Sequence, residues 1–100
     1  MTLIQIVQDI QTNINKFMHE ISHSDDLYEK ITITVDVINE RANLIMNSNS
    51  IPANGRIFEE AFITFINLTS DYSFYFNQKL KMLSNDYKTA YDEYFVINDL

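Results

Sequence analysis

The chain has 100 residues, and 14 acidic side chains against 7 Lys and Arg give it a formal net charge of −7. The basic residues are scattered, so the chain lacks the clustered cationic face that nucleic-acid binding requires. Cysteine is absent, which excludes a disulfide framework and thiolate chemistry. A hydrophobic fraction of 46% is too high for a disordered chain, and we expect one helical domain over residues 1–100.

Composition also bears on source and compartment. The abundance of Ile and Asn, with one Gly and one Pro, predicts the A/T-rich genome of a low-GC bacterium, phage or plasmid. The first apolar run lacks early Lys or Arg and is broken by Gln5, Gln8 and Asp9, unlike a signal peptide. No stretch approaches the ~18 apolar residues that span a membrane. We expect a cytoplasmic protein with no membrane partner, and secretion by a signal-less route stays open.

The first segment predicts an amphipathic helix over residues 2–21. Its apolar residues alternate at steps of four and three, which is a heptad seam. Further apolar residues widen this stripe, as expected for a helix packed in a bundle. The seam consists of Leu3, Val7, Ile10, Ile14, Phe17 and Ile21.

A polar break precedes a second predicted helix over residues 26–47. Asp26 and Glu29 resemble a capping box at its start. Within this helix, residues 31–37 alternate with period two and are mostly β-branched, which indicates a strand. We favour a helix because the flanking pattern is helical and a lone strand would have no partner, although the strand stays open.

Residues 47–55 hold the only Pro and the only Gly, and they predict a loop near the middle of the chain. Beyond it, the apolar pattern predicts helices over 56–83 and 86–97. Both 69–71 and 84–86 are good N-cap sequences, and we place the break at 84–86. The predicted fold class is all-α, a compact antiparallel three- or four-helix bundle.

One short segment, His19-Glu20-Ile21-Ser22-His23, matches the pattern H-E-x-x-H. Two His four apart on a helix can share a zinc ion, with Glu20 as general base, and the segment resembles the zincin metallopeptidases. Glu40 would supply the third ligand. However, the seam places both His on the outer helix face, and no β-sheet is expected before them. We therefore predict no metal, no cofactor and no enzyme, and keep a minimal zinc-dependent hydrolase as the alternative.

Three adjacent acidic pairs suggest a further alternative. The pairs are Asp25-Asp26, Glu59-Glu60 and Asp92-Glu93. Helix N-caps and a solvated face explain them most simply. If they lined one face, the protein would be an acidic nucleic-acid mimic that inhibits a DNA-binding enzyme.

Aromatic residues are concentrated in the second half of the chain, where 11 of 13 follow residue 57. Successive helix residues are about 100° apart, so Phe74, Tyr75 and Phe76 cannot all face one core. At least one is exposed unless a partner covers it, although a bundle that surrounds this helix would also bury them. The predicted partner-binding residues are Tyr72, Phe74, Tyr75, Phe76, Tyr87, Tyr91 and Tyr94.

Two segments resemble families of secreted bacterial proteins. Residues 53–55, followed by Phe58 and Phe62, are similar to the W-x-G turn of the small helical-hairpin proteins exported by type VII secretion, with the Trp missing. Residues 70–77 are similar to the C-terminal helix motif of type III secretion needle subunits, although this chain is longer and its N-terminal half is more apolar. The first resemblance implies a turn between two helices at Gly55.

These observations favour a non-catalytic, acidic helical protein that acts by protein–protein binding. It would be an adaptor, an inhibitor or immunity protein, or a secretion-type assembly subunit. Its expected partner is another protein or a second copy of itself, and not nucleic acid.

Overall fold

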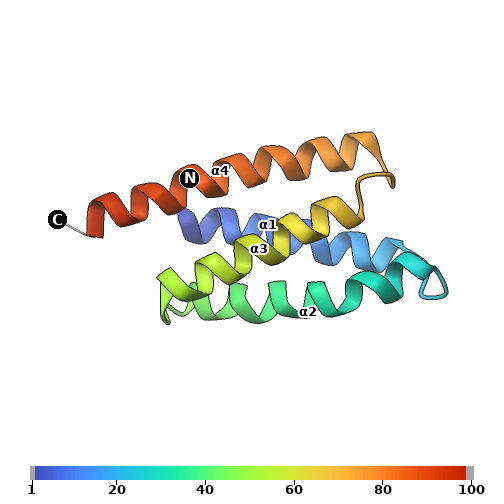
Figure 1. The fold of residues 1–100 in the computed structure, drawn as a ribbon, viewed down its shortest axis with the longest axis horizontal. Helices are drawn as coiled ribbons and strands as arrows, with labels where there is room; N and C mark the ends of the chain where they lie inside the picture. Colours follow the sequence, from blue (N-terminus) through green and yellow to red (C-terminus); the bar gives the residue numbers. More distant parts are fainter. Residues whose placement is uncertain (1, 99–100) are drawn as a thin grey trace.

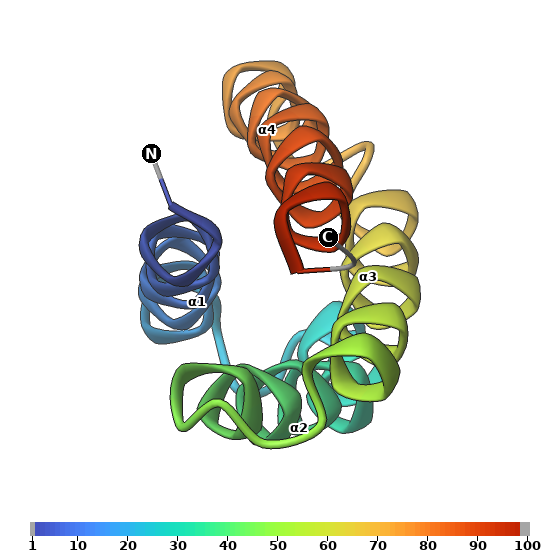
Figure 2. The ribbon, with the colours of Figure 1, turned by 90° about the vertical axis from the view of Figure 1, so that its left-hand side faces the viewer.

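The computed structural model describes residues 2–98, and the side chains of residues 2–94. Four helices follow one another, α1 (Leu3–Glu20), α2 (Asp26–Met46), α3 (Ile51–Leu68) and α4 (Phe74–Asn98), and this part of the chain contains no strand. Each helix packs against its neighbours in the chain, and α4 closes the ring on α1 (Figures 1 and 2). The prediction of an all-α bundle is confirmed.

The bundle is elongated, with principal extents of 49 × 24 × 17 Å. Successive helices run in opposite directions, so α1 begins and α4 ends at the same end of the bundle (Figure 1). The α3–α4 turn lies at the opposite end. Within residues 2–98, no helix combines the length and the apolarity needed to cross a membrane.

Helix α1 follows its heptad seam closely. Thr2 and Gln5 form a capping box at its start, with each side chain accepting a backbone N–H of the other residue. The helix ends at Glu20, where Ile21 adopts an extended conformation. All six predicted seam residues are buried, so this face of α1 forms one side of the core.

Helix α2 includes the segment whose pattern suggested a strand. Ile31 and Val35 are buried while Ile33 is 75% exposed, so burial follows a step of four and not of two. The helical interpretation of residues 31–37 is confirmed. At the start of α2 the cap is Asp25 and not Asp26, because the Asp25 carboxylate accepts the Leu27 N–H at 2.8 Å.

The prediction of a loop over residues 47–55 is wrong in its second half, because α3 already begins at Ile51. Pro52 lies in the first turn, where its missing N–H leaves no helical hydrogen bond unmade. The connection is residues 47–50, with Ser48 and Ser50 at φ of 60° and 44°. The buried Asn54 stabilises it by donating to the Asn49 carbonyl at 2.6 Å.

The predicted helices over 56–83 and 86–97 are also wrong, because the chain turns at residues 69–73 and residues 84–86 lie inside α4. The turn is fixed by one hydrogen bond at the end of α3 and by one that joins α4 to α3. The Thr69 hydroxyl is buried and donates to the Phe65 carbonyl at 2.8 Å. Asn77, also buried, donates to the Ile66 carbonyl at 3.4 Å. The Asn77 amide provides a partner for the Ile66 carbonyl, one of the last four carbonyls of α3.

Candidate protein-binding surface

The turn between α3 and α4 exposes aromatic side chains at one end of the bundle. Tyr72 is 48% exposed, Phe74 82% and Tyr75 81%. We call these three residues the aromatic edge. Of the seven large apolar side chains exposed among the described residues, four lie within residues 68–75. Burying a side chain of this size is worth about 1.5–3 kcal/mol, so this turn leaves substantial hydrophobic free energy unused.

The aromatic edge rests on a packed aromatic base. Phe76 stacks on Phe17 of α1 with ring centroids 5.0 Å apart, and it meets Phe65 of α3 edge-on at 6.5 Å. The Phe17 ring also contacts the Tyr72 ring, at 4.6 Å in a T-shaped arrangement. Phe76 therefore faces the core while Phe74 and Tyr75 face outward, as the 100° step between helix residues requires.

The other three predicted residues pack against the core, and two of them bond to the backbone of α3. Tyr87 is only 1% exposed, and its hydroxyl donates to the Gly55 carbonyl at 2.6 Å. Burial raises the pKa of the Tyr87 hydroxyl. Tyr91 donates to the Pro52 carbonyl at 2.6 Å, and Tyr94 packs partly buried against the core. The predicted set thus divides into the exposed aromatic edge and four residues that hold the bundle together.

Gly55 explains why these tyrosines lie so close to α3. It lies inside the helix and not in a turn, so the resemblance to a W-x-G turn does not extend to its conformation. A Cβ at this position would overlap Cε2 of Tyr91 and lie 3.2 Å from the Tyr87 hydroxyl. The missing side chain lets both rings reach the backbone carbonyls of α3.

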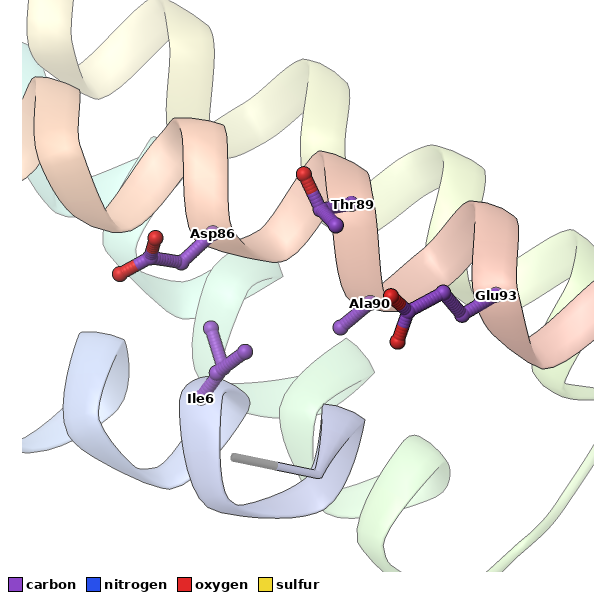
Figure 3. A pocket seen from close by; sticks show the side chains of 5 residues that line it. All are labelled: Ile6, Asp86, Thr89, Ala90 and Glu93. Atoms are coloured by element: carbon purple, nitrogen blue, oxygen red, sulfur yellow. The ribbon is translucent and has the colours of Figure 1, made fainter.

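A groove between α1 and α4 forms a second surface feature. At one end, a cavity of about 290 Å³ is bordered by Ile6 of α1 and by Asp86, Thr89, Ala90 and Glu93 of α4. Figure 3 shows both carboxylates pointing toward the gap above Ile6. At the other end, a cavity of about 160 Å³ is bordered by Lys16, Phe17, Glu20, Tyr75, Phe76 and Lys79, together with Asn13. We call these two cavities together the α1–α4 groove.

The predicted zinc ligands are not brought together. Helix α1 ends at Glu20, so His23 lies beyond the helix, where its ring stacks on Tyr28 at 4.4 Å. The two His therefore do not occupy successive turns of one helix, which the H-E-x-x-H mechanism requires. Glu40 lies far along α2, 3.8 Å from Arg41. Among the described residues, no three His, Cys, Asp or Glu side chains are arranged to hold a metal ion.

The three acidic pairs lie on three different parts of the bundle. Asp25-Asp26 is at the start of α2 and Asp92-Glu93 is near the end of α4, at opposite ends of the molecule (Figure 1). Glu59-Glu60 lies in the middle of α3. The fold therefore does not gather the pairs into one acidic patch.

Comparison with known proteins adds no relative to this picture: neither a protein-family model, nor a curated protein, nor a solved structure matches the chain. Its function is therefore inferred from the surfaces described above.

Proposed function

We propose that the protein is a non-catalytic binding module that docks on a partner protein through the aromatic edge. It would serve as an adaptor, an inhibitor or an assembly subunit in the cytoplasm of a low-GC bacterium, or of a host of its phage or plasmid. The observation that carries this proposal is the pair Phe74 and Tyr75, each about four-fifths exposed on a helix whose next residue, Phe76, is anchored in the core.

Aromatic side chains suit this task for a physical reason. They supply a large apolar area for few rotatable bonds, and Tyr and Phe are enriched at protein interfaces. Because Phe76 and Phe17 already hold the turn, docking would not incur the entropy cost of ordering it. An excess of seven negative charges favours a partner whose rim is basic.

Affinity capture with matched variants tests the proposal. Phe74→Asp removes the most exposed aromatic ring among the described side chains, and Ile33→Asp places the same charge at an exposed apolar position on α2. We expect a partner retained by the wild type and by Ile33→Asp to be lost with Phe74→Asp, while all three proteins melt at similar temperatures. If Phe74→Asp and Ile33→Asp retained the same proteins as the wild type, the aromatic edge would not be the docking surface.

A further inference from the structure

The α1–α4 groove carries opposite charges at its two ends. Lys16 and Lys79 border the end whose apolar base is Phe17 and Phe76, and Glu20 is the one carboxylate there. At the other end the charged lining residues are carboxylates, those of Asp86 and Glu93. Figure 3 shows them on α4, on either side of Ala90 and facing α1. Along the bundle axis, the groove therefore changes from a mainly positive end to a negative end.

Helix α4 has a heptad spacing of its own on the side that includes residues bordering this groove. Six residues follow one another at alternating steps of four and three, which places them on one face of the helix. Two of them are large apolar side chains left exposed, Tyr75 at 81% and Met82 at 67%. We call this set the α4 stripe, which consists of Tyr75, Lys79, Met82, Asp86, Thr89 and Glu93.

The α4 stripe is distinct from the face that α4 buries in its own bundle. The buried residues of that face include Asn77, Leu80, Tyr87 and Ala90. Helix α4 therefore presents one seam to its own core and a second seam, along the groove, to the outside. A second seam with exposed apolar residues at coiled-coil spacing is a surface suited to another helix.

We infer that the helix filling this groove is α4 of a second copy of the chain, in an antiparallel, two-fold symmetric dimer. Lys79 lies about 10 Å from Asp86 and about 21 Å from Glu93 along the helix axis. A two-fold axis between Met82 and Asp86 reverses this order in the other copy. Each Lys79 then lies beside the carboxylates of the partner copy, and the two Met82 side chains lie near the axis.

The order of charges along α4 favours an antiparallel pair of helices over a parallel pair. In a parallel pair, Lys79 would face Lys79 and each carboxylate would face its own counterpart, which is repulsive. The antiparallel pair also leaves room for the proposed function, because Phe74 lies about 100° around the helix from Tyr75. Phe74 and Tyr72 would remain exposed, so the dimer is a separate interaction that shares only Tyr75 with the aromatic edge.

Sedimentation velocity on charge-reversed variants tests the dimer. We expect the wild type to approach twice its monomer mass of 11.8 kDa as its concentration rises. Lys79→Glu alone, and Asp86→Lys with Glu93→Lys in one chain, should each raise the dissociation constant at least ten-fold. An equimolar mixture of these two variant proteins should dimerise again, because opposite charges then face each other in every pair.

The control variant is Lys81→Glu, which makes the same charge change on the same helix at an exposed position outside the α4 stripe. It should dimerise like the wild type, and circular dichroism establishes that every variant keeps its helices. A wild type that stays monomeric at about 1 mM would overturn the inference. So would a mixture that fails to dimerise, or a Lys81→Glu variant as impaired as Lys79→Glu. Phe74→Asp should still dimerise, which separates this inference from the proposed function.

Discussion

Substituting the single glycine tests whether α4 packs on α3 as described. Gly55 lies in the interior of α3, and there helix propensity alone predicts that Gly55→Ala stabilises the protein by about 1 kcal/mol. The structure predicts the opposite sign. The added Cβ would overlap the Tyr91 ring, with Cδ2 of that ring at 3.0 Å and the Tyr87 hydroxyl at 3.2 Å.

The magnitude follows from what Tyr91 must give up in order to move. Its hydroxyl would lose the 2.6 Å hydrogen bond to the Pro52 carbonyl, worth about 0.5–1.5 kcal/mol. Its ring would lose its stacking on Tyr87, at a centroid distance of 5.7 Å, worth a similar amount. These losses exceed the propensity gain, so we expect Gly55→Ala to lower the free energy of unfolding by about 1 kcal/mol.

A double-mutant cycle measured by urea denaturation, followed by circular dichroism at 222 nm, checks this reasoning. In a Tyr91→Ala background the overlap is gone, and Gly55→Ala should then stabilise the protein by about 0.5–1 kcal/mol. The coupling energy between the two positions should therefore be about 1–2 kcal/mol. If Gly55→Ala raised the stability of both backgrounds equally, Tyr91 would not pack against α3.

Two further substitutions concern the first turns of α3. Tyr87→Phe removes the buried hydroxyl that donates to Gly55 and should cost about 1–2 kcal/mol in thermal unfolding. Burial raises the pKa of Tyr87 above its usual 10.0, so the folded state keeps a proton that the unfolded chain releases. The free energy of unfolding should therefore fall as the pH rises above 10, and it should fall less steeply in Tyr87→Phe. Asn54→Ala removes the bond to Asn49 and the partner of the Arg41 guanidinium, which donates to Asn54 at 2.8 Å, and should lower stability by about 2 kcal/mol or more.

Exposed residues of the same type supply the controls. Tyr75→Phe should leave the melting temperature unchanged, because the Tyr75 side chain is 81% exposed. Asn67→Ala, at an exposed position in α3, should stay within about 0.5 kcal/mol of the wild type. Equal effects of Asn54→Ala and Asn67→Ala would mean that Asn54 does not fix the α2–α3 connection.

Periodicity was sufficient to predict α1 and α2, because each helix buries one continuous face. The break between α3 and α4 could not be predicted in the same way, since residues 69–71 and 84–86 are equally good N-caps by local chemistry. The burial of Thr69 and the bond from Asn77 to Ile66 decide between them, and both depend on how the helices meet. Local propensity contains no information on such contacts.

The candidate surface was predictable to a similar extent. The helical step required that Phe74, Tyr75 and Phe76 face different directions, and they do. Which ring turns inward depends on Phe17, far away in the sequence. Gly55 was interpreted as a loop residue. The reason for a glycine at this position is the close approach of Tyr91, which lies 36 positions further along the chain.

The positions of the helix ends determine which surface stays accessible when the protein is fused or immobilised. The start of α1 and the end of α4 share one end of the 49 Å long bundle, and the aromatic edge occupies the other (Figure 1). A fusion partner or a solid support attached at either terminus would therefore hold the aromatic edge at the distal tip. Immobilised in this way, the protein would present the aromatic edge end-on, with the length of the bundle acting as a spacer.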